Sequence, residues 1–347
     1  MQKKDAKGNL TIKMFFLIFL LAAVIVVSTC MGYIKISPRQ VLMVIAAAIT
    51  GDTTSLAETG HVIPYVIMAV RLPRILTSAI VGAGLSIAGV VFQGILMNPL
   101  ADPYTLGISA GAAFGAAIAL LSDMMFLGLY TVPVFAFAGA LVTLVAVIFI
   151  ASSDGNTSSN NLILSGIIVA SILSAGISFL KYLADEQVSI IIFWLMGSFG
   201  SKTWLDVFLV LAFVFAGFLV CMFFSRDLNI MSLGDRSALS LGIETRRVRI
   251  ILLITASLVT AGCVSVSGII GFVGLVIPHL MRFFLGPDNR ALIPTSALAG
   301  AILLLIADTV TRAVLPHEIP IGVLTALIGG PFFCYIFRKK RIGVTRG

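Results

Sequence analysis

The pattern GxSxG, at residues 107 to 111, is the first set of residues whose types and spacing could do chemistry. In hydrolases this pattern places a nucleophilic serine on a sharp turn between a strand and a helix. Here Ser109 lies inside an apolar run that predicts a helix, so the exposed turn is missing. We therefore predict no catalytic residue on this chain, which is not expected to be an enzyme.

The residue types that bind metals are scattered along the chain. His61, His279 and His317 lie far apart in the sequence and at different predicted depths, so they suggest no metal cluster. All four cysteines lie within or at the ends of apolar runs and show no CxxC spacing. We predict neither a metal site nor a disulfide for Cys30, Cys221, Cys263 and Cys334.

The sequence also lacks the means to drive transport by itself. It contains no GxxxxGK[ST] motif, so we expect no nucleotide site and no cofactor on this chain. Ion-coupled carriers usually place titratable groups deep in the membrane, and Asp308 is the only acid well within a predicted span. Arg312, four residues later, is its expected partner. Any ATP and magnesium should therefore bind to a separate ATPase.

Composition identifies the elements that carry these residues. The chain has 347 residues, 59% hydrophobic and only 11% charged, against about a quarter charged in soluble domains. Runs without a charged residue cover 75–97, 124–153, 155–180 and 207–225. They are continuous, as in membrane-spanning helices, and do not alternate as barrel strands do. We predict an all-α integral membrane protein in which residues 1–347 form one transmembrane domain.

About ten transmembrane helices are predicted. The longest charge-free stretch, 250–281, would measure about 48 Å as one helix, which is too long for one crossing. We expect a break near Ser267-Gly268, and basic residues at both ends of the stretch favour a hairpin. The predicted spans are 14–34, 71–96, 104–122, 131–151, 162–183, 204–224, 247–265, 268–285, 291–312 and 319–337.

Charge orients these spans. Sixteen of the 23 Lys and Arg residues fall on the side of the two termini, which predicts that both termini are cytoplasmic. Arg71, Arg74 and Arg312 are among the seven cations left on the outer side. Two apolar stretches are too short to cross, and we expect them at the outer interface: a helix from Ser37-Pro38 to about Ile49, and residues 188–196.

Small residues recur at helix-packing spacing, as at Gly82, Gly89, Gly111 and Gly115. We interpret them mainly as sites where helix backbones approach closely, with a pore lining as the alternative.

Seven ordered motifs resemble the permease family of cobalamin, heme and ferric-siderophore ABC importers (the FecCD/BtuC type). They cover the chain nearly end to end. The motifs are Arg71-Leu72-Pro73-Arg74, NPLADP at 98–103, WLMGS at 194–198, ALSLG at 238–242, GFVGLVIPH at 271–279, Ala307-Asp308 and IPIG at 319–322.

This resemblance implies a type II ABC importer permease: a homodimer of ten-helix subunits with a translocation chamber at the two-fold axis. It implies two cytoplasmic ATPase subunits below and an extracytoplasmic substrate-binding protein above. The polar segment 225–245 then corresponds to the coupling helices that contact the ATPase. Its candidate residues are Ser237, Ala238, Leu239, Ser240, Leu241, Gly242 and Ile243.

The resemblance also assigns roles on the outer side. Arg71, Arg74 and Arg312 match positions that pair with acidic residues of the binding protein, and a charged rim would orient such a partner. The stretch 188–196 matches the helix at the outer mouth, with Phe193, Trp194, Met196 and Gly197 as its candidate residues.

A cytoplasmic gate is implied at two turns, one holding Asn98 and Leu100 and the other Ser158, Ser159 and Asn160. The chain is thus identified as a multi-pass permease of the inner membrane of a bacterium or archaeon, importing a metal chelate. A ferric siderophore is the favoured cargo, with cobalamin or heme as alternatives. An ion-coupled secondary transporter is the competing class.

Overall fold

The computed structural model describes residues 2–32, 34–51, 62–122, 126–152, 158–314 and 317–344. Within these ranges the elements are helices, and no β-strand occurs. Seven helical stretches are long and apolar enough to cross a membrane, which confirms the predicted all-α membrane fold. Three further predicted spans correspond to shorter apolar helices, α5 (Ile108–Leu121), α13 (Val273–Leu285) and the apolar part of α15 (Ile321–Val344).

The long helices agree with the predicted spans within a few residues at most ends. Two differ: α1 begins well before residue 14, and the helix predicted from 71 is continuous from Val62, because α3 (Val62–Tyr65) and the π-helix η2 (Val66–Arg71) lead into it. The long helices are α1 (Gln2–Cys30), α4 (Leu72–Ile95), α6 (Thr131–Ala151), α7 (Ser159–Leu183), α9 (Trp204–Phe223), α12 (Thr245–Ser267) and α14 (Asn289–Ala313).

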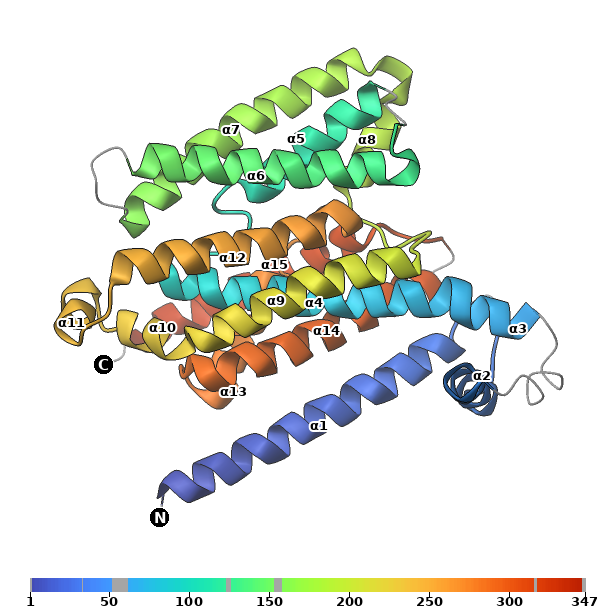
Figure 1. Ribbon diagram of the computed structural model, residues 1–347, viewed down its shortest axis with the longest axis horizontal. Coiled ribbons are helices and arrows are strands. Elements are labelled where there is room, and N and C mark those ends of the chain that lie inside the picture. Colours follow the sequence, from blue (N-terminus) through green and yellow to red (C-terminus); the bar gives the residue numbers. More distant parts are fainter. Residues whose placement is uncertain are drawn as a thin grey trace.

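Helix α4 forms the centre of the molecule, surrounded by α9, α12, α13 and α14 (Figure 1). Most residues of α4 are buried. The backbone of α14 comes so close that a Cβ atom on Gly82 would overlap the Gly300 carbonyl. The small residues therefore allow the close helix packing that was predicted. Such packing matters because the hydrophobic effect does not drive helices together in lipid.

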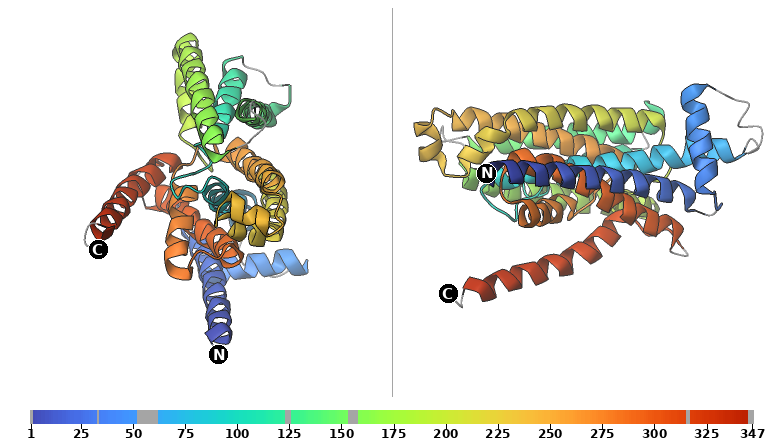
Figure 2. Two further views of the ribbon diagram at one scale, coloured as in Figure 1. Left: turned by 90° about the vertical axis from the view of Figure 1, so that its left-hand side faces the viewer. Right: turned by 90° about the horizontal axis from the view of Figure 1, so that it is seen from below.

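Helices α5, α6 and α7 form a second group at one side of the body (Figure 1). A Cβ atom on Gly111 of α5 would meet the Gly139 carbonyl of α6 at 2.6 Å, so these two helices also pack backbone against backbone. Helix α1 lies on the opposite side, along α14 (Figure 2).

The break predicted in the long apolar stretch occurs where expected. Helix α12 ends at Ser267, Gly268 follows with φ +70°, and α13 begins only at Val273. Glycine adopts this left-handed region without the steric cost that a Cβ imposes. Residues 268–272 are therefore a non-helical segment that enters the helical body.

The two ends of the molecule differ. The start of α1 and the end of α15 lie at the end that carries α10 (Ser225–Met231) and α11 (Asp235–Ser240) (Figure 2). The amphipathic helix α2 (Pro38–Thr50) lies at the other end, and its N-terminal Ser37 and Gln40 form a capping box. The C-terminal part of α15 leaves the body of the molecule (Figure 2).

Candidate functional site

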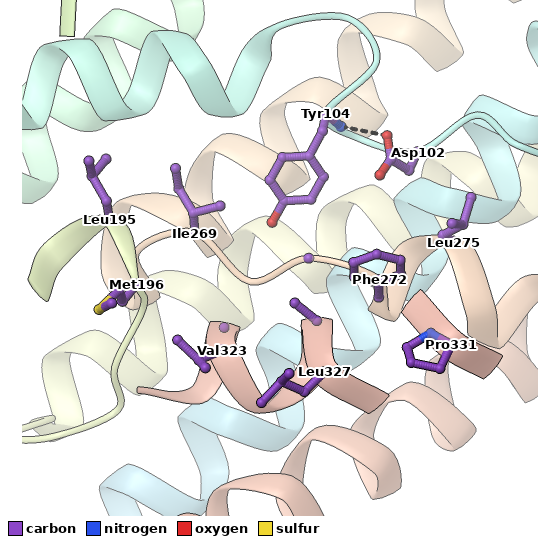
Figure 3. Close-up of a pocket in the computed structure, with 13 residues that line it drawn as sticks. Asp102, Tyr104, Leu195, Met196, Ile269, Phe272, Leu275, Val323, Leu327 and Pro331 are labelled. Carbon is purple, nitrogen blue, oxygen red and sulfur yellow. Dashed lines mark hydrogen bonds between the residues drawn. The ribbon is translucent and has the colours of Figure 1, made fainter. Parts of the chain in front are cut away.

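A cavity of about 750 Å³ lies between the end of α8 (Val188–Leu195), the two non-helical segments near 102 and 270, and α15 (Figure 3). Its walls are mainly apolar, with Met196, Phe272 and Leu327 among them. Asp102 and Tyr104 are the polar side chains that reach it. A large cavity with few polar groups suits a bulky organic ligand better than a bare ion.

Two interrupted spans shape this cavity. Helix α5 starts only at Ile108, and the segment before it turns at Asp102, whose Oδ1 accepts hydrogen bonds from the backbone N–H groups of Tyr104 and Thr105 at 3.1 and 3.0 Å. Pro103 packs near Gly274 in the first turn of α13. Non-helical backbone among membrane spans is stable only where protein or a water-filled cavity surrounds it, and interrupted helices often form transport sites.

Phe272 occupies a strained position in the cavity wall. Its φ of +68° lies in the left-handed region, which costs a residue with a Cβ about 1–2 kcal/mol. Its side chain lies against Gly329 of α15, and it borders a second, apolar cavity of about 200 Å³. The surrounding structure therefore holds this aromatic side chain between two cavities.

The predicted outer-mouth residues lie at the end of α8. Met196 lines the cavity, whereas Phe193 is exposed. The carbonyls of Gly197 and Met196 accept hydrogen bonds from the N–H groups of Ile321 and Gly322 at 3.2 and 3.0 Å. A Cβ atom on Gly268 would overlap the Trp194 carbonyl. The end of α8 is thus joined to the start of α15 and to the break after α12.

The three arginines predicted on the outer side lie together but bond within the chain. Arg71 is buried and donates to the carbonyls of Thr29, at 2.6 Å, and Ile34. Arg312 donates to the carbonyls of Met31 and Ser28 at 2.7 and 2.8 Å. The carbonyls of Ser28 and Thr29 lie in the last turn of α1 and those of Met31 and Ile34 just beyond it, where cationic donors satisfy unpaired acceptors and favour the helix dipole.

The expected pairing of Asp308 with Arg312 is wrong. Asp308 instead forms an ion pair with Arg74 of α4, with 2.9 Å between Oδ1 and Nη2. Arg74 also contacts Glu318 at 3.1 Å. Arg312, one helical turn after Asp308, is directed to the end of α1 instead, and no proton relay is needed to explain the buried acid.

The predicted gate turns meet at the end of α4. Asn98 accepts a hydrogen bond from the Leu100 N–H at 2.9 Å, and Ser158 caps α7 by accepting from the Asn161 N–H. Ser159 donates to the carbonyl of Ile95, the last residue of α4, at 3.0 Å, while Asn160 is exposed. The two turns are therefore adjacent.

The segment 225–245 folds into two short helices at the same end. Ala238 is fully buried, whereas Leu239 and Leu241 are 58% and 62% exposed. Ser237 and Ile243 take part in the turn that ends α11, where Ser240 donates to the Ser237 carbonyl and Gly242 has φ +83°. Leu239 and Leu241 thus present apolar side chains on an otherwise polar segment.

Two links tie these short helices to the spans. Arg249 of α12 contacts Asp235 of α11 at 2.6 Å. Asn229 of α10 donates to Asp288 at 2.8 Å and accepts from the N–H of Asn289, at the start of α14. Hydrogen bonding to Arg290 holds the pKa of the Asp288 carboxyl at about 2. A displacement of α10 or α11 would therefore pull on α14 or α12.

The cavity residues Asp102, Tyr104 and Phe272 were not among the predicted site residues, although Asp102 and Phe272 belong to two of the family motifs. One signal was available: Asp102-Pro103 directly precedes a predicted span, and a residue before proline disfavours the helical conformation. Phe272 gave no such signal, since Phe rarely adopts positive φ.

The comparisons with known proteins agree with this architecture. The model of the FecCD transport family matches residues 20–339. The chain is 43% identical to the cobalamin import system permease protein BtuC of Halobacterium salinarum, over 82% of this chain and 76% of that protein. It is 37% identical to the Fe(3+)-citrate import system permease protein YfmE of Bacillus subtilis, over 97% of each. A solved structure described as an inward-facing metal-chelate type ABC transporter superimposes with a TM-score of 0.80, at 34% identity, covering 94% of this chain and 98% of that one.

Proposed function

Since this chain belongs to the FecCD transport family and is a permease of the metal-chelate type of ABC importer, we propose that its cargo is a ferric siderophore. The cavity of about 750 Å³ carries this proposal. It is far larger than a bare ion, and the described residues hold no group of three or more His, Cys, Asp or Glu side chains that could bind a metal. A metal would have to arrive already wrapped in an organic chelator.

Cobalamin is the second candidate cargo, favoured by the 43% identity to a cobalamin permease. Heme is a third, although the described histidine on α13, His279, packs its ring edge-to-face against Phe333. The test is to purify the binding protein of this importer with its natural ligand and identify that ligand by mass spectrometry. Uptake of a ⁵⁵Fe-siderophore, ⁵⁷Co-cobalamin and heme into proteoliposomes should then show one preferred cargo. Preference for cobalamin or heme would overturn the siderophore assignment.

Energy would come from two ATPase subunits that bind ATP and magnesium and contact residues 237–243. The exposed leucines and the links to α12 and α14 support this role. Uptake should be abolished by vanadate and should persist when an ionophore dissipates the ion gradients. The opposite pattern would indicate an ion-coupled secondary transporter.

The working unit would be a homodimer whose cytoplasmic gate lies at Asn98, Leu100 and residues 158–160. In such a dimer, exposed apolar side chains on α7 and α15, among them Ile172 and Leu327, would face the partner subunit instead of lipid. The end that carries α10 and α11, with both chain termini, would face the cytoplasm of a bacterial or archaeal cell. Arg71, Arg74 and Arg312 would form the rim that receives the binding protein at the opposite end.

A further inference from the structure

Arg74 differs from Arg71 and Arg312 because its guanidinium contacts two acidic side chains, one buried and one exposed. Its Nε and Nη2 atoms donate to Asp308 at 2.9 to 3.2 Å, and its Nη1 atom donates to Glu318 at 3.1 Å. The Asp308 side chain is 1% exposed, whereas that of Glu318 is 56% exposed. The guanidinium thus has a buried, fixed contact and an outward contact that solvent can reach.

Among the described residues, Arg71 and Arg312 make no such outward contact. Their side chains donate to backbone carbonyls at and beyond the end of α1, and those carbonyls cannot leave without moving the helix. At Arg71 and Arg312, a carboxylate of the binding protein would have to displace these backbone carbonyls. At Arg74 it would compete only with the side chain of Glu318.

We propose that Glu318 holds the place of an acidic side chain of the binding protein, which displaces it from Arg74 when the two proteins dock. The inference rests on the docking role proposed above and divides that role among the arginines. Arg74 is the exchangeable contact, while Arg71 and Arg312 are positioning residues that fix the end of α1 beside it.

The energies of the two contacts make the exchange feasible. An exposed ion pair contributes little and is readily replaced by an equivalent one, so Glu318 can leave Arg74 at small cost. The pair with Asp308 stays, because its loss would leave a buried charge alone. The guanidinium therefore keeps its orientation while its outer partner changes.

The position of Glu318 gives this exchange a route to the outer mouth. It lies three residues before α15, whose first N–H groups, at Ile321 and Gly322, bond to the carbonyls of Gly197 and Met196 at the end of α8. Releasing Glu318 frees the segment that leads into these bonds. Docking and the mouth would thus be connected through a few residues of backbone.

The test uses E318Q, which keeps the shape of the side chain and removes its charge. E186Q is the matched control, because Glu186 is an exposed acid at the same end without a contact to Arg74. The full-length permease with its ATPases is placed in nanodiscs, and binding of the importer's own binding protein is measured at low salt. We expect E318Q to bind roughly two- to five-fold more tightly than wild type, with E186Q unchanged.

The possible outcomes separate the two proposals. Equal tightening by E318Q and E186Q would be a general charge effect and would overturn the exchange. Unchanged or weaker binding by E318Q would also overturn it, and weaker binding would mean that Glu318 itself touches the binding protein. If wild type fails to bind the binding protein at all, the docking role falls and this inference falls with it. Equal thermal unfolding midpoints of E318Q and wild type would exclude a folding defect.

Discussion

Arg74 of α4 and Asp308 of α14 are 234 residues apart in sequence, yet their side chains form an ion pair with an Nη2 to Oδ1 distance of 2.9 Å. Both residues belong to helices at the centre of the molecule. The pair therefore joins the two helices whose backbones also meet at Gly82 and Gly300.

Loss of the Asp308 charge should destabilise the fold. In D308N the buried guanidinium keeps only a neutral neighbour on its inner side, and breaking a buried pair costs about 3–5 kcal/mol. The amide still accepts a hydrogen bond, so we expect the lower end of this range, measured as a reduced free energy of unfolding in detergent. E318Q, which alters only the exposed contact, should cost less than about 1 kcal/mol. Equal stability of D308N and E318Q would contradict the structural role of the pair.

Two adjacent glycines of α15 should respond differently to alanine. A Cβ atom at position 329 would lie 2.5 Å from the Cβ of Phe272, whereas the nearest atom to one at position 330 is 3.7 Å away. G329A should lose about 1–3 kcal/mol through overpacking. G330A should be neutral or slightly stabilising, because alanine favours helices. Chemical unfolding of both variants tests this. Similar losses of unfolding free energy in G329A and G330A would show that the Phe272 side chain moves aside at little cost.

The exposed leucines near α11 should matter for ATPase binding. If Leu241 is buried in that interface, L241S would lose about 1.5 kcal/mol of hydrophobic contact, or roughly ten-fold in affinity for the ATPase. L129S makes the same change at Leu129, an exposed leucine of the turn before α6, and should bind normally. Pull-down titration of the ATPase measures both variants. Normal binding by L241S would remove Leu241 from the coupling surface.

The link between α10 and α14 should weaken in acid. The hydrogen bond from Arg290 holds the pKa of Asp288 at about 2, below its usual 3.8, so its stabilising contribution is complete above pH 4. That contribution is lost as the pH falls through about 2, because the carboxyl then binds a proton in the folded state too. Wild type should lose stability relative to D288N between pH 4 and pH 2. Parallel unfolding curves for the two proteins over this range would refute the assignment.

The positions of the spanning helices could be predicted because their signals are local. Charge-free runs defined the spans, and the expected cap at Ser37 and the break at Ser267-Gly268 both occur in the structure. Residues 104–107 were predicted as helix and are not, because the turn at Asp102 and the contact of Pro103 with Gly274 hold this segment away from helical geometry. The turn at Asp102 is local, but the contact of Pro103 with Gly274 joins distant parts of the chain.

The partners of the arginine side chains could not be predicted from local signals either. The spacing of Asp308 and Arg312 on one helix fits a local pair, but the buried acid pairs with Arg74, which approaches from α4. Arg312 instead meets carbonyls near the end of α1, about 280 residues earlier. Helix periodicity locates such residues on a helix face, and tertiary packing decides which partner that face meets.

The arginine contacts at the end of α1 also have a consequence for biosynthesis. Helix α1 leaves the ribosome well before α14, but two carbonyls at its C-terminal end receive their donors from Arg312, which is made about 280 residues later. Its Ser28 hydroxyl likewise waits for Thr309. Helix α1 therefore cannot reach its final position until α14 has been made, and truncated chains that lack α14 should retain a loosely attached α1.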